Sequence, residues 1–318
     1  MFYGCFALQK RNNMKIAHLS DIHFTTFFRN SVLYKFEKIL RYCNSINIDH
    51  LIITGDLVEN PDPYDFELLR KALKQTGFLS SDRLSLVIGN HDIFGGVLTI
   101  QDFLNFSGRC ETVDYKRKVR EFSLYFSESF ENCVYVSPKN IFPYAKIIDG
   151  VLIIGLNSVA EYSKTKNLFA SNGEINNWQL NELTEILNKH KNCKTKLVLI
   201  HHHFHETKSI PESKLGSVWQ IIEKQTMKLR TKRKLIEIFN NYNVDLVMHG
   251  HYHNTSEYYR KGIRFLNAGG SFKNEFKNIN QINLIDTNSS PIKIEIHQIP
   301  QILYPQIFSL NQLNSVIT

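Results

Sequence analysis

The sequence HLIITGDLV at residues 50–58 contains the pattern that decides the fold, a short apolar run followed by glycine and a carboxylate. The run His50–Thr54 has the length and the β-branched composition of a buried strand. Gly55 lets the backbone approach neighbouring groups closely, and Asp56 follows it as a lone carboxylate. The pattern predicts a strand that delivers Asp56 to the edge of a sheet.

Four further strand-like runs end in the same kind of polar cluster. The runs are Lys15–Leu19, Leu84–Ile88, Leu197–Ile200 and Leu246–Met248. The clusters that follow them contain Asp21 and His23, then Asn90, His91 and Asp92, then His201, and finally His249, His251 and His253. Sites in open α/β sheets form outside the carboxyl ends of the strands, so we expect all five clusters to converge.

Helical patterns alternate with these strands. Apolar residues recur at helical spacing between Val32 and Leu40, and further helices are expected at Phe66–Thr76, Trp178–Lys189 and Lys234–Tyr242. Asp149-Gly150 predicts a β-hairpin between two apolar runs. Strands that alternate with helices indicate an α/β layer architecture.

Two stretches interrupt this rhythm, at about residues 94–132 and 204–233. Each is too long for a simple connection in a compact domain, so we expect helical insertions rather than separate domains. The expected organisation is a single domain over residues 14–299, with an N-terminal extension at 1–13 and a C-terminal tail at 300–318.

Composition sets the broad class of protein. The chain has 318 residues, of which 42% are hydrophobic and 21% charged, as in an ordinary globular protein. No apolar run approaches the roughly 18 residues of a membrane span, and Met1–Lys10 lacks the features of a signal peptide. The five cysteines are scattered, which favours a reducing compartment. We expect a cytoplasmic protein, with the inner membrane surface as the alternative location.

The net charge of +8 is distributed unevenly. Residues 208–234 contain eight basic and two acidic residues. Such a segment favours an anionic partner, which could be a phosphorylated substrate, an anionic lipid surface or nucleic acid. A solvated helix face explains the same charges equally well, so both interpretations remain open.

The side chains in the five clusters indicate a metal site. Carboxylate, amide oxygen and imidazole together suit Mn²⁺, Fe²⁺ or Zn²⁺. Seven candidate ligands are too many for one ion and suit two ions that share a bridging carboxylate, for which Asp56 is the natural choice. The candidates are Asp21, His23, Asp56, Asn90, His201, His251 and His253.

Other histidines lie close to these clusters. In the run His201–His205 we choose His201 as the ligand because it directly follows the apolar strand, and His202 is the alternative. The remaining histidines are interpreted as packing residues, which are His18 and His249, or as surface residues, which are His50, His190 and His297.

The order of the motifs resembles that of the calcineurin-like metallophosphoesterase superfamily. The matching motifs are Asp21-Ile22-His23, Gly55-Asp56, Gly89-Asn90-His91-Asp92, His201 and Gly250-His251-Tyr252-His253, over about residues 14–270. The resemblance implies a central two-sheet β-sandwich flanked by helices. It also implies two metal ions, one at Asp21, His23, Asp56 and His253 and the other at Asp56, Asn90, His201 and His251.

The same resemblance implies catalytic roles for His91 and Asp92. His91 would contact the phosphoryl group or protonate the leaving group, and Asp92 would orient His91. The expected reaction is in-line attack on phosphorus by a hydroxide that bridges the two ions.

Several substrates are compatible with this site. We expect a phosphodiester or pyrophosphate bond, in a small diester, a cyclic nucleotide or a nucleotide-sugar lipid such as a UDP-diacylglucosamine-type lipid A precursor. Aromatic residues of the first insertion, among them Phe106, Phe122 and Phe126, could line an acyl-chain groove or pack in a core. A phosphomonoesterase and a nuclease are the alternatives within the superfamily. A non-catalytic metal-binding scaffold is less expected, because every ligand position is filled.

Overall fold

The computed structural model describes residues 14–26, 30–97, 99–205, 228–269, 271 and 279–300. Within these residues two mixed β-sheets pack face to face. The first sheet has the strand order β12-β11-β1-β2-β3 and the second has the order β4-β5-β6-β7-β8-β10-β9. The predicted two-sheet sandwich is therefore confirmed.

The strands of the first sheet are β1 (Lys15–Leu19), β2 (His50–Thr54), β3 (Leu84–Val87), β11 (Ile279–Asp286) and β12 (Lys293–Pro300). Those of the second are β4 (Tyr135–Ser137), β5 (Ile141–Ile148), β6 (Val151–Gly155), β7 (Thr195–Leu199), β8 (Leu246–His249), β9 (Thr255–Arg260) and β10 (Ile263–Ala268). Strands β1, β2 and β3 are parallel, as are β6, β7, β8 and β10. Strands β4 and β9 were not predicted, because their half-exposed residues form no apolar run.

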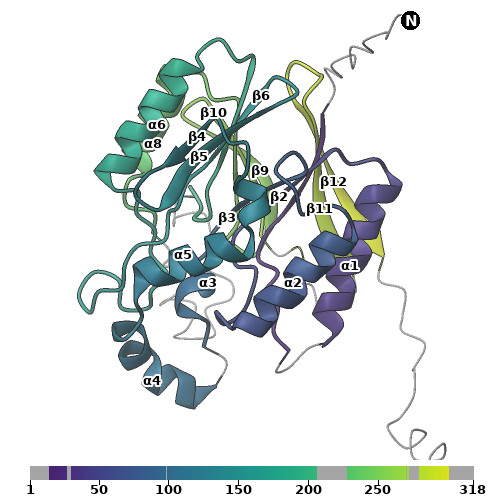
Figure 1. Ribbon diagram of the computed structural model, residues 1–318. Coiled ribbons are helices and arrows are strands. Elements are labelled where there is room, and N and C mark those ends of the chain that lie inside the picture. The colour runs from purple at the N-terminus through teal and green to yellow at the C-terminus, as the bar shows by residue number, and fades with distance from the viewer. Residues whose placement is uncertain are drawn as a thin grey trace, which may run out of the picture.

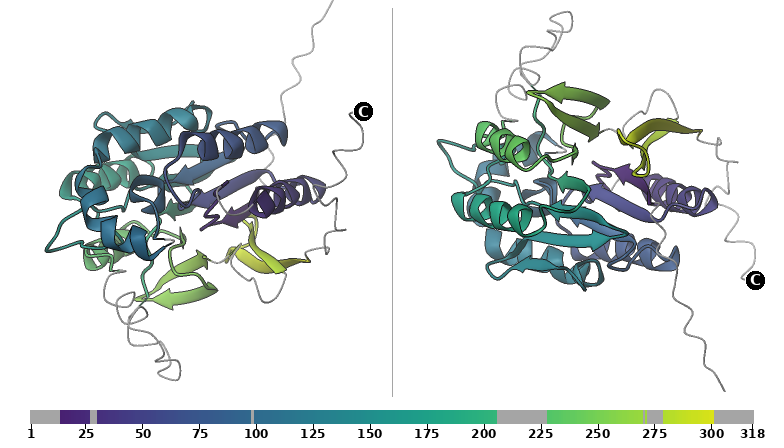
Figure 2. Two further views of the ribbon diagram at one scale, coloured as in Figure 1. Left: turned by 90° about the horizontal axis from the view of Figure 1, so that it is seen from below. Right: turned by 90° about the horizontal axis from the view of Figure 1, so that it is seen from above.

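Helices cover both outer faces of the sandwich (Figure 1). They are α1 (Asn30–Ser45), α2 (Pro63–Gln75), α3 (His91–Phe94), α4 (Ile100–Glu111), α5 (Tyr115–Tyr125), the 3₁₀ turn η1 (Ser127–Phe130), α6 (Asn177–Lys189) and α8 (Lys232–Asn241). Helices α1 and α2 lie on the side of the first sheet, and α6 and α8 lie on the side of the second, a separation that Figure 2 shows from two further directions. Among the described helices, none combines the length and apolar composition that crossing a bilayer requires.

Alternating side chains on the strands build two hydrophobic layers. On β6, Ile153 faces the layer between the sheets, whereas Leu152 and Ile154 face α6 and α8. This alternation follows from the two-residue period of a strand, and it explains why the strands read as continuous apolar runs. Both faces of the central strands are buried.

Two polar side chains also join the sheets. The hydroxyl of Tyr144 on β5 donates to the carbonyl of Leu86 on β3 at 3.0 Å. The ammonium of Lys146, which is buried, donates to the carbonyl of Leu84 on β3 at 2.5 Å and to that of Ser81, in the turn before this strand, at 2.9 Å. Burial lowers the pKa of Lys146 to about 8.

The structure describes the two insertions to different extents. The first contains α4, α5 and η1, and is helical as predicted. Most of the second, residues 206–227, lies outside the described residues, as does most of the basic segment 208–234. Residues 1–13 and 301–318 also lie outside them.

The prediction that His50 lies at the surface was wrong. His50 is fully buried, its Nδ1 donates to the carbonyl of Asp82 at 2.7 Å, and its Nε2 lies 2.9 Å from Oγ of Ser85. The neutral imidazole satisfies both contacts, since one nitrogen donates and the other accepts. Burial and the charge of Lys146 lower the pKa of His50 to about 3.

We expect His50 to make stability depend on pH. Its pKa is lower in the folded state than the roughly 6.5 of the unfolded chain, so its contribution is complete above pH 6.5 and is lost as the pH falls towards 3. Between pH 7.5 and 5 the wild type should lose about 2 kcal/mol more unfolding free energy than a His50→Gln variant. Urea unfolding at both pH values measures the difference, and equal losses would contradict the assignment.

Candidate metal centre

The carboxyl ends of β1, β2, β3, β7 and β8 meet at one edge of the sandwich, and the predicted ligands converge there. In a first group, Nε2 of His253 lies 3.5 Å from Oδ1 of Asp21 and 3.2 Å from Nε2 of His23. Nε2 of His23 lies 3.9 Å from Oδ1 of Asp21. These three side chains are close enough to share one cation.

A second group surrounds His201. Its Nε2 lies 3.1 Å from Oδ1 of Asn90, 3.1 Å from Nδ1 of His251 and 3.3 Å from Oδ2 of Asp56. Its Nδ1 donates to the carbonyl of Thr54 at 2.8 Å, which fixes the ring and directs Nε2 into the group.

Asp56 lies between the two groups. Its Oδ2 is 3.8 Å from Nε2 of His23 in the first group and 3.3 Å from Nε2 of His201 in the second. Its Oδ1 accepts a hydrogen bond from the backbone N–H of His91 at 2.9 Å. The structure thus brings all seven predicted ligands together around one carboxylate.

The electrostatics of this cluster suit cations. Asp21 and Asp56 are almost completely buried, and isolated buried carboxylates are costly. Burial raises the pKa of Asp56, but the charges of His201 and His91 lower it more, so that it lies well below its usual range. Burial lowers the pKa of His201, while the Asp56 carboxylate raises it to about 9. Lone pairs of oxygen and imidazole nitrogen face one another here, as in a site for divalent ions.

The backbone at the site adopts an unusual conformation. Asp21, His23, Asp56 and His251 all have positive φ, between 49° and 68°. This region is unfavourable for residues other than glycine and persists only where contacts enforce it. Here the N–H of Asp21 donates to Gly55 at 3.1 Å, and that of His251 donates to the Asp21 carboxylate at 3.0 Å. These contacts hold the strained backbone of the ligand loops in place.

Asp92 does not orient His91, contrary to the expectation from the resemblance. Its Oδ1 accepts from the backbone N–H groups of Leu57 at 2.8 Å and Val58 at 3.1 Å, and its Oδ2 accepts from that of Gly89 at 2.9 Å. Asp92 therefore ties the loop after β2 to the loop after β3. Burial and the nearby Asp56 carboxylate raise its pKa to about 7.

Glu59, rather than Asp92, is the carboxylate that lies beside the His91 ring. Its Oε1 lies 3.5 Å from Nδ1 of His91, and its Oε2 lies 2.9 Å from Nδ1 of His23. Burial raises the pKa of Glu59, but its contacts with the two imidazoles hold it well below the usual range. In the sequence, the only indication of this role of Glu59 is its position three residues after Asp56, on the same loop.

The other histidines of the region belong to neither group of candidate ligands. Nδ1 of His202 lies 2.8 Å from Oγ of Ser158, and the ring of His205 stacks on Tyr258 with centroids 3.9 Å apart. His249 is buried with Nε2 2.8 Å from the Tyr258 hydroxyl, and His18 is buried with Nε2 2.9 Å from Oγ1 of Thr54. His18 and His249 are packing residues, as predicted.

Comparison with known proteins identifies relatives of this chain. The family model described as calcineurin-like phosphoesterase matches residues 14–255. A search of curated proteins finds no match.

Solved structures share the fold. A purple acid phosphatase from yellow lupin (Lupinus luteus) seeds is similar with a TM-score of 0.57 and 14% identity, over 90% of this chain and 51% of that one. This chain thus spans about half the length of the lupin chain. A dimetal phosphatase from Danio rerio has a TM-score of 0.54 and 10% identity, over 91% of this chain and 99% of that one. GAP50, the anchor in the inner membrane complex of Plasmodium, has a TM-score of 0.50 and 12% identity, over 95% and 93%.

A substitution at Gly89 is expected to disturb the cluster. An added Cβ would overlap Oδ1 and the backbone nitrogen of Asp56, so Gly89→Ala should displace this carboxylate, weaken binding of divalent ions and cost about 1–3 kcal/mol of stability. Gly108→Ala on α4 is the matched control, because no atom lies within 4 Å of its added Cβ. It should stabilise the chain by about 0.5–1 kcal/mol. Urea unfolding and Mn²⁺ titration compare the two variants, and similar behaviour would refute the close approach.

Proposed function

The chain belongs to the calcineurin-like phosphoesterase family, and we propose that it hydrolyses phosphoester bonds through two divalent ions bound by the seven converging side chains. Asp21, His23 and His253 would hold one ion, and Asn90, His201 and His251 the other, with Asp56 shared. The observation that carries this proposal is the position of Oδ2 of Asp56, 3.8 Å from His23 and 3.3 Å from His201. When bound, the ions would acidify a water molecule and neutralise phosphoryl oxygens.

We assign to His91 the proton transfer to the leaving group. Its side chain is 22% exposed, whereas those of Asp21 and His201 are fully buried, so a substrate can reach it. Glu59 holds Nδ1 of His91 and stays ionised, which stabilises the protonated imidazole. Asp92 supports this arrangement indirectly, since it positions the loops that carry Asp56 and His91.

Among possible substrates we propose a small phosphodiester. Four of the apolar residues that could have lined an acyl groove, Phe106, Phe122, Phe126 and Phe130, are buried in the hydrophobic core, whereas Phe103, Leu104 and Leu124 are exposed. The nucleotide-sugar lipid therefore stays the alternative substrate. An anionic membrane surface as the partner of segment 208–234 stays a prediction.

A substrate panel tests this proposal. The Mn²⁺-loaded protein is assayed with cyclic nucleotides, glycerophosphodiesters, phosphomonoesters, single-stranded DNA and a UDP-linked acylated sugar. The highest kcat/KM should fall on a diester of low molecular mass. A preference for the acylated sugar, for a monoester or for DNA would assign the chain to one of the alternatives.

Metal content separates the two-ion proposal from a scaffold role. After chelation and reloading, the wild type should bind close to two Mn²⁺ per chain, and Asp56→Asn should lose metal and reduce hydrolysis by about a thousandfold or more, because both ions share this carboxylate. His205→Ala is the control, since His205 belongs to neither group of candidate ligands. Full metal content and activity in Asp56→Asn would refute the shared-ligand arrangement.

His91→Ala should separate metal binding from proton transfer. Both ions should remain bound, while kcat for a poor leaving group falls by about 10²–10⁴-fold, because general acid catalysis is lost. The loss should be much smaller for a nitrophenyl ester, whose leaving group needs no proton. Equal losses for the two kinds of substrate would show that His91 has another role.

A further inference from the structure

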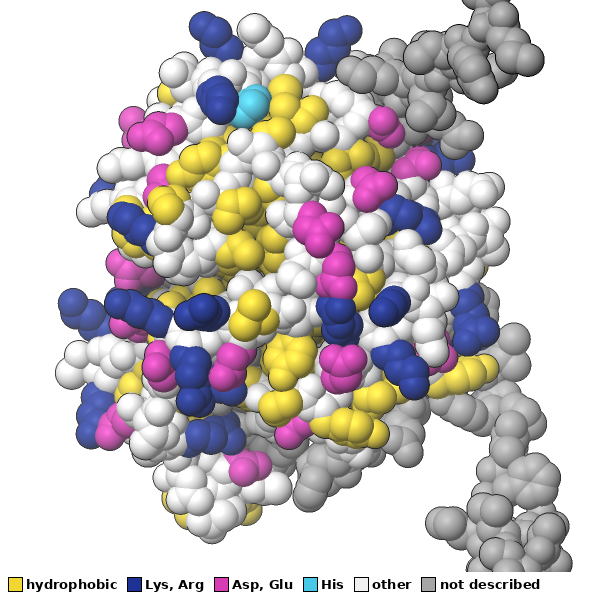
Figure 3. Space-filling view, in the orientation of Figure 1, with side chains coloured by type: hydrophobic (Ala, Val, Ile, Leu, Met, Phe, Trp, Pro, Cys, Tyr) yellow, Lys and Arg dark blue, Asp and Glu magenta, His cyan; other side chains and the backbone are white. Residues whose placement is uncertain are grey.

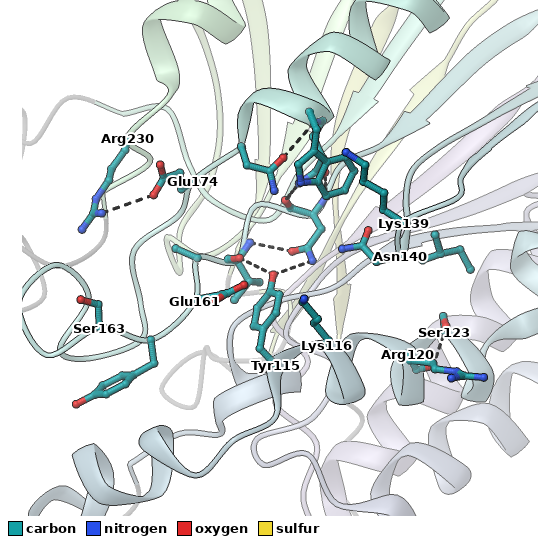
Figure 4. Close-up of a pocket in the computed structure, with 18 of the residues that line it drawn as sticks. Tyr115, Lys116, Arg120, Ser123, Lys139, Asn140, Glu161, Ser163, Glu174 and Arg230 are labelled. Carbon is teal, nitrogen blue, oxygen red and sulfur yellow. Dashed lines mark hydrogen bonds and ion pairs between the residues drawn. The ribbon is translucent and has the colours of Figure 1, made fainter.

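A cavity of about 1020 Å³ lies beside the candidate metal centre (Figure 4). Its walls come from α5, the turn between β4 and β5, the loop after β6 and the start of α6. Asn157 and Val159 line it, and Ser158 between them contacts His202, whose ring lies 4.4 Å from that of His251. None of the seven candidate ligands lines this cavity, so it is a separate space next to the metal centre.

The lining of the cavity carries an excess of positive charge. Five basic side chains face two carboxylates, Glu161 and Glu174. Glu174 pairs with Arg230 at 3.6 Å. The basic residues are Lys116, Arg120, Lys139, Lys166 and Arg230. The uncompensated charge suits an anion of more than one negative charge.

Two of these cations lie close to Asn140. Figure 4 shows Lys116 extending from α5 towards Asn140, with Lys139 above it, whereas Arg120 lies farther along the same helix and points away from them. Glu121 on α5 pairs instead with Arg117 at 3.3 Å and with Lys118 at 3.1 Å. Its carboxylate is therefore engaged away from the cavity.

The rest of the cavity wall is polar, and hydrogen bonds hold its side chains in place. Oε1 of Gln179 accepts from the N–H of Asn157 at 3.2 Å, and Nδ2 of Asn157 donates to the Tyr115 hydroxyl at 3.0 Å. Lys139 lies over the Trp178 ring, 4.8 Å from its centroid. Oδ1 of Asn140 is a buried acceptor that has no hydrogen-bond partner among the described residues.

We propose that this cavity binds a small organic phosphate, either a nucleotide or a sugar phosphate. Its phosphate contacts Lys116 and Lys139, and its organic part lies along the polar wall formed by Asn157 and Gln179. The volume suits a ligand of that size, and the polar wall suits a body rich in hydrogen-bonding groups. This site is distinct from the metal centre and does not depend on the proposed hydrolysis.

The surface around the cavity argues against nucleic acid as the occupant. A nucleic-acid site needs a continuous basic groove or stripe that follows the backbone. On the face shown in Figure 3, basic side chains are interspersed with acidic and apolar ones. The five basic side chains that line the cavity lie at its exposed rim.

Calorimetric titration of the full-length, Mn²⁺-loaded protein tests the proposal. The probes are an adenosine 5′-phosphonate, a glucose 6-phosphonate and methylphosphonate, in which a carbon–phosphorus bond prevents hydrolysis. The first two distinguish a nucleotide from a sugar phosphate, and methylphosphonate reports the anion alone. Binding to the cavity should persist after the metal is chelated, whereas binding to the metal centre should not.

Two matched variants locate the binding. Lys116→Gln/Lys139→Gln should weaken binding of the preferred organic phosphonate by at least about tenfold, since charge-assisted contacts are lost. Arg117→Gln removes a neighbouring exposed cation that does not line the cavity, and it should bind like the wild type. Both variants should keep their metal content and hydrolysis, so a failure of the two-metal proposal would show separately. The proposal is overturned if no organic phosphonate saturates, if methylphosphonate binds as tightly, or if the double variant binds unchanged.

Discussion

Two buried carboxylates, Asp21 and Asp56, impose the constraint on which the rest of the site depends. Neither can remain ionised in such surroundings unless cations or N–H donors surround it. The chain supplies donors from the backbone, the N–H of His251 to Asp21 and that of His91 to Asp56. The glycine that precedes Asn90 and the positive φ angles of the ligand loops allow the backbone to come this close.

The site exists only where the two sheets meet. Loops after β1, β2 and β3 of the first sheet carry Asp21, His23, Asp56 and Asn90, and loops after β7 and β8 of the second carry His201, His251 and His253. Neither sheet holds a complete set of ligands for either group. Contacts that join the sheets, such as those of Tyr144 and Lys146, therefore also maintain the geometry of the site.

The two other carboxylates near Asp56, those of Asp92 and Glu59, have different roles. Asp92 bonds to backbone N–H groups and joins two ligand loops, whereas Glu59 contacts two imidazoles. A carboxylate that accepts hydrogen bonds from three N–H groups stiffens the loops, and one that pairs with imidazoles sets their orientation and charge. The first insertion adds aromatic core beside α2 and, through α5, one wall of the cavity.

Local patterns in the sequence predicted the order of the central strands and main helices and the seven side chains that the structure brings together. Apolar runs of strand length and the residues directly after them are local patterns, and the parallel strands then place their ends at one edge. The fold alone reveals that Glu59 rather than Asp92 lies against His91, that His50 is buried, and that β4 and β9 complete the second sheet. These features depend on contacts between residues distant in the chain, such as His91 with Glu59 and Lys146 with Ser81, and no local pattern encodes them.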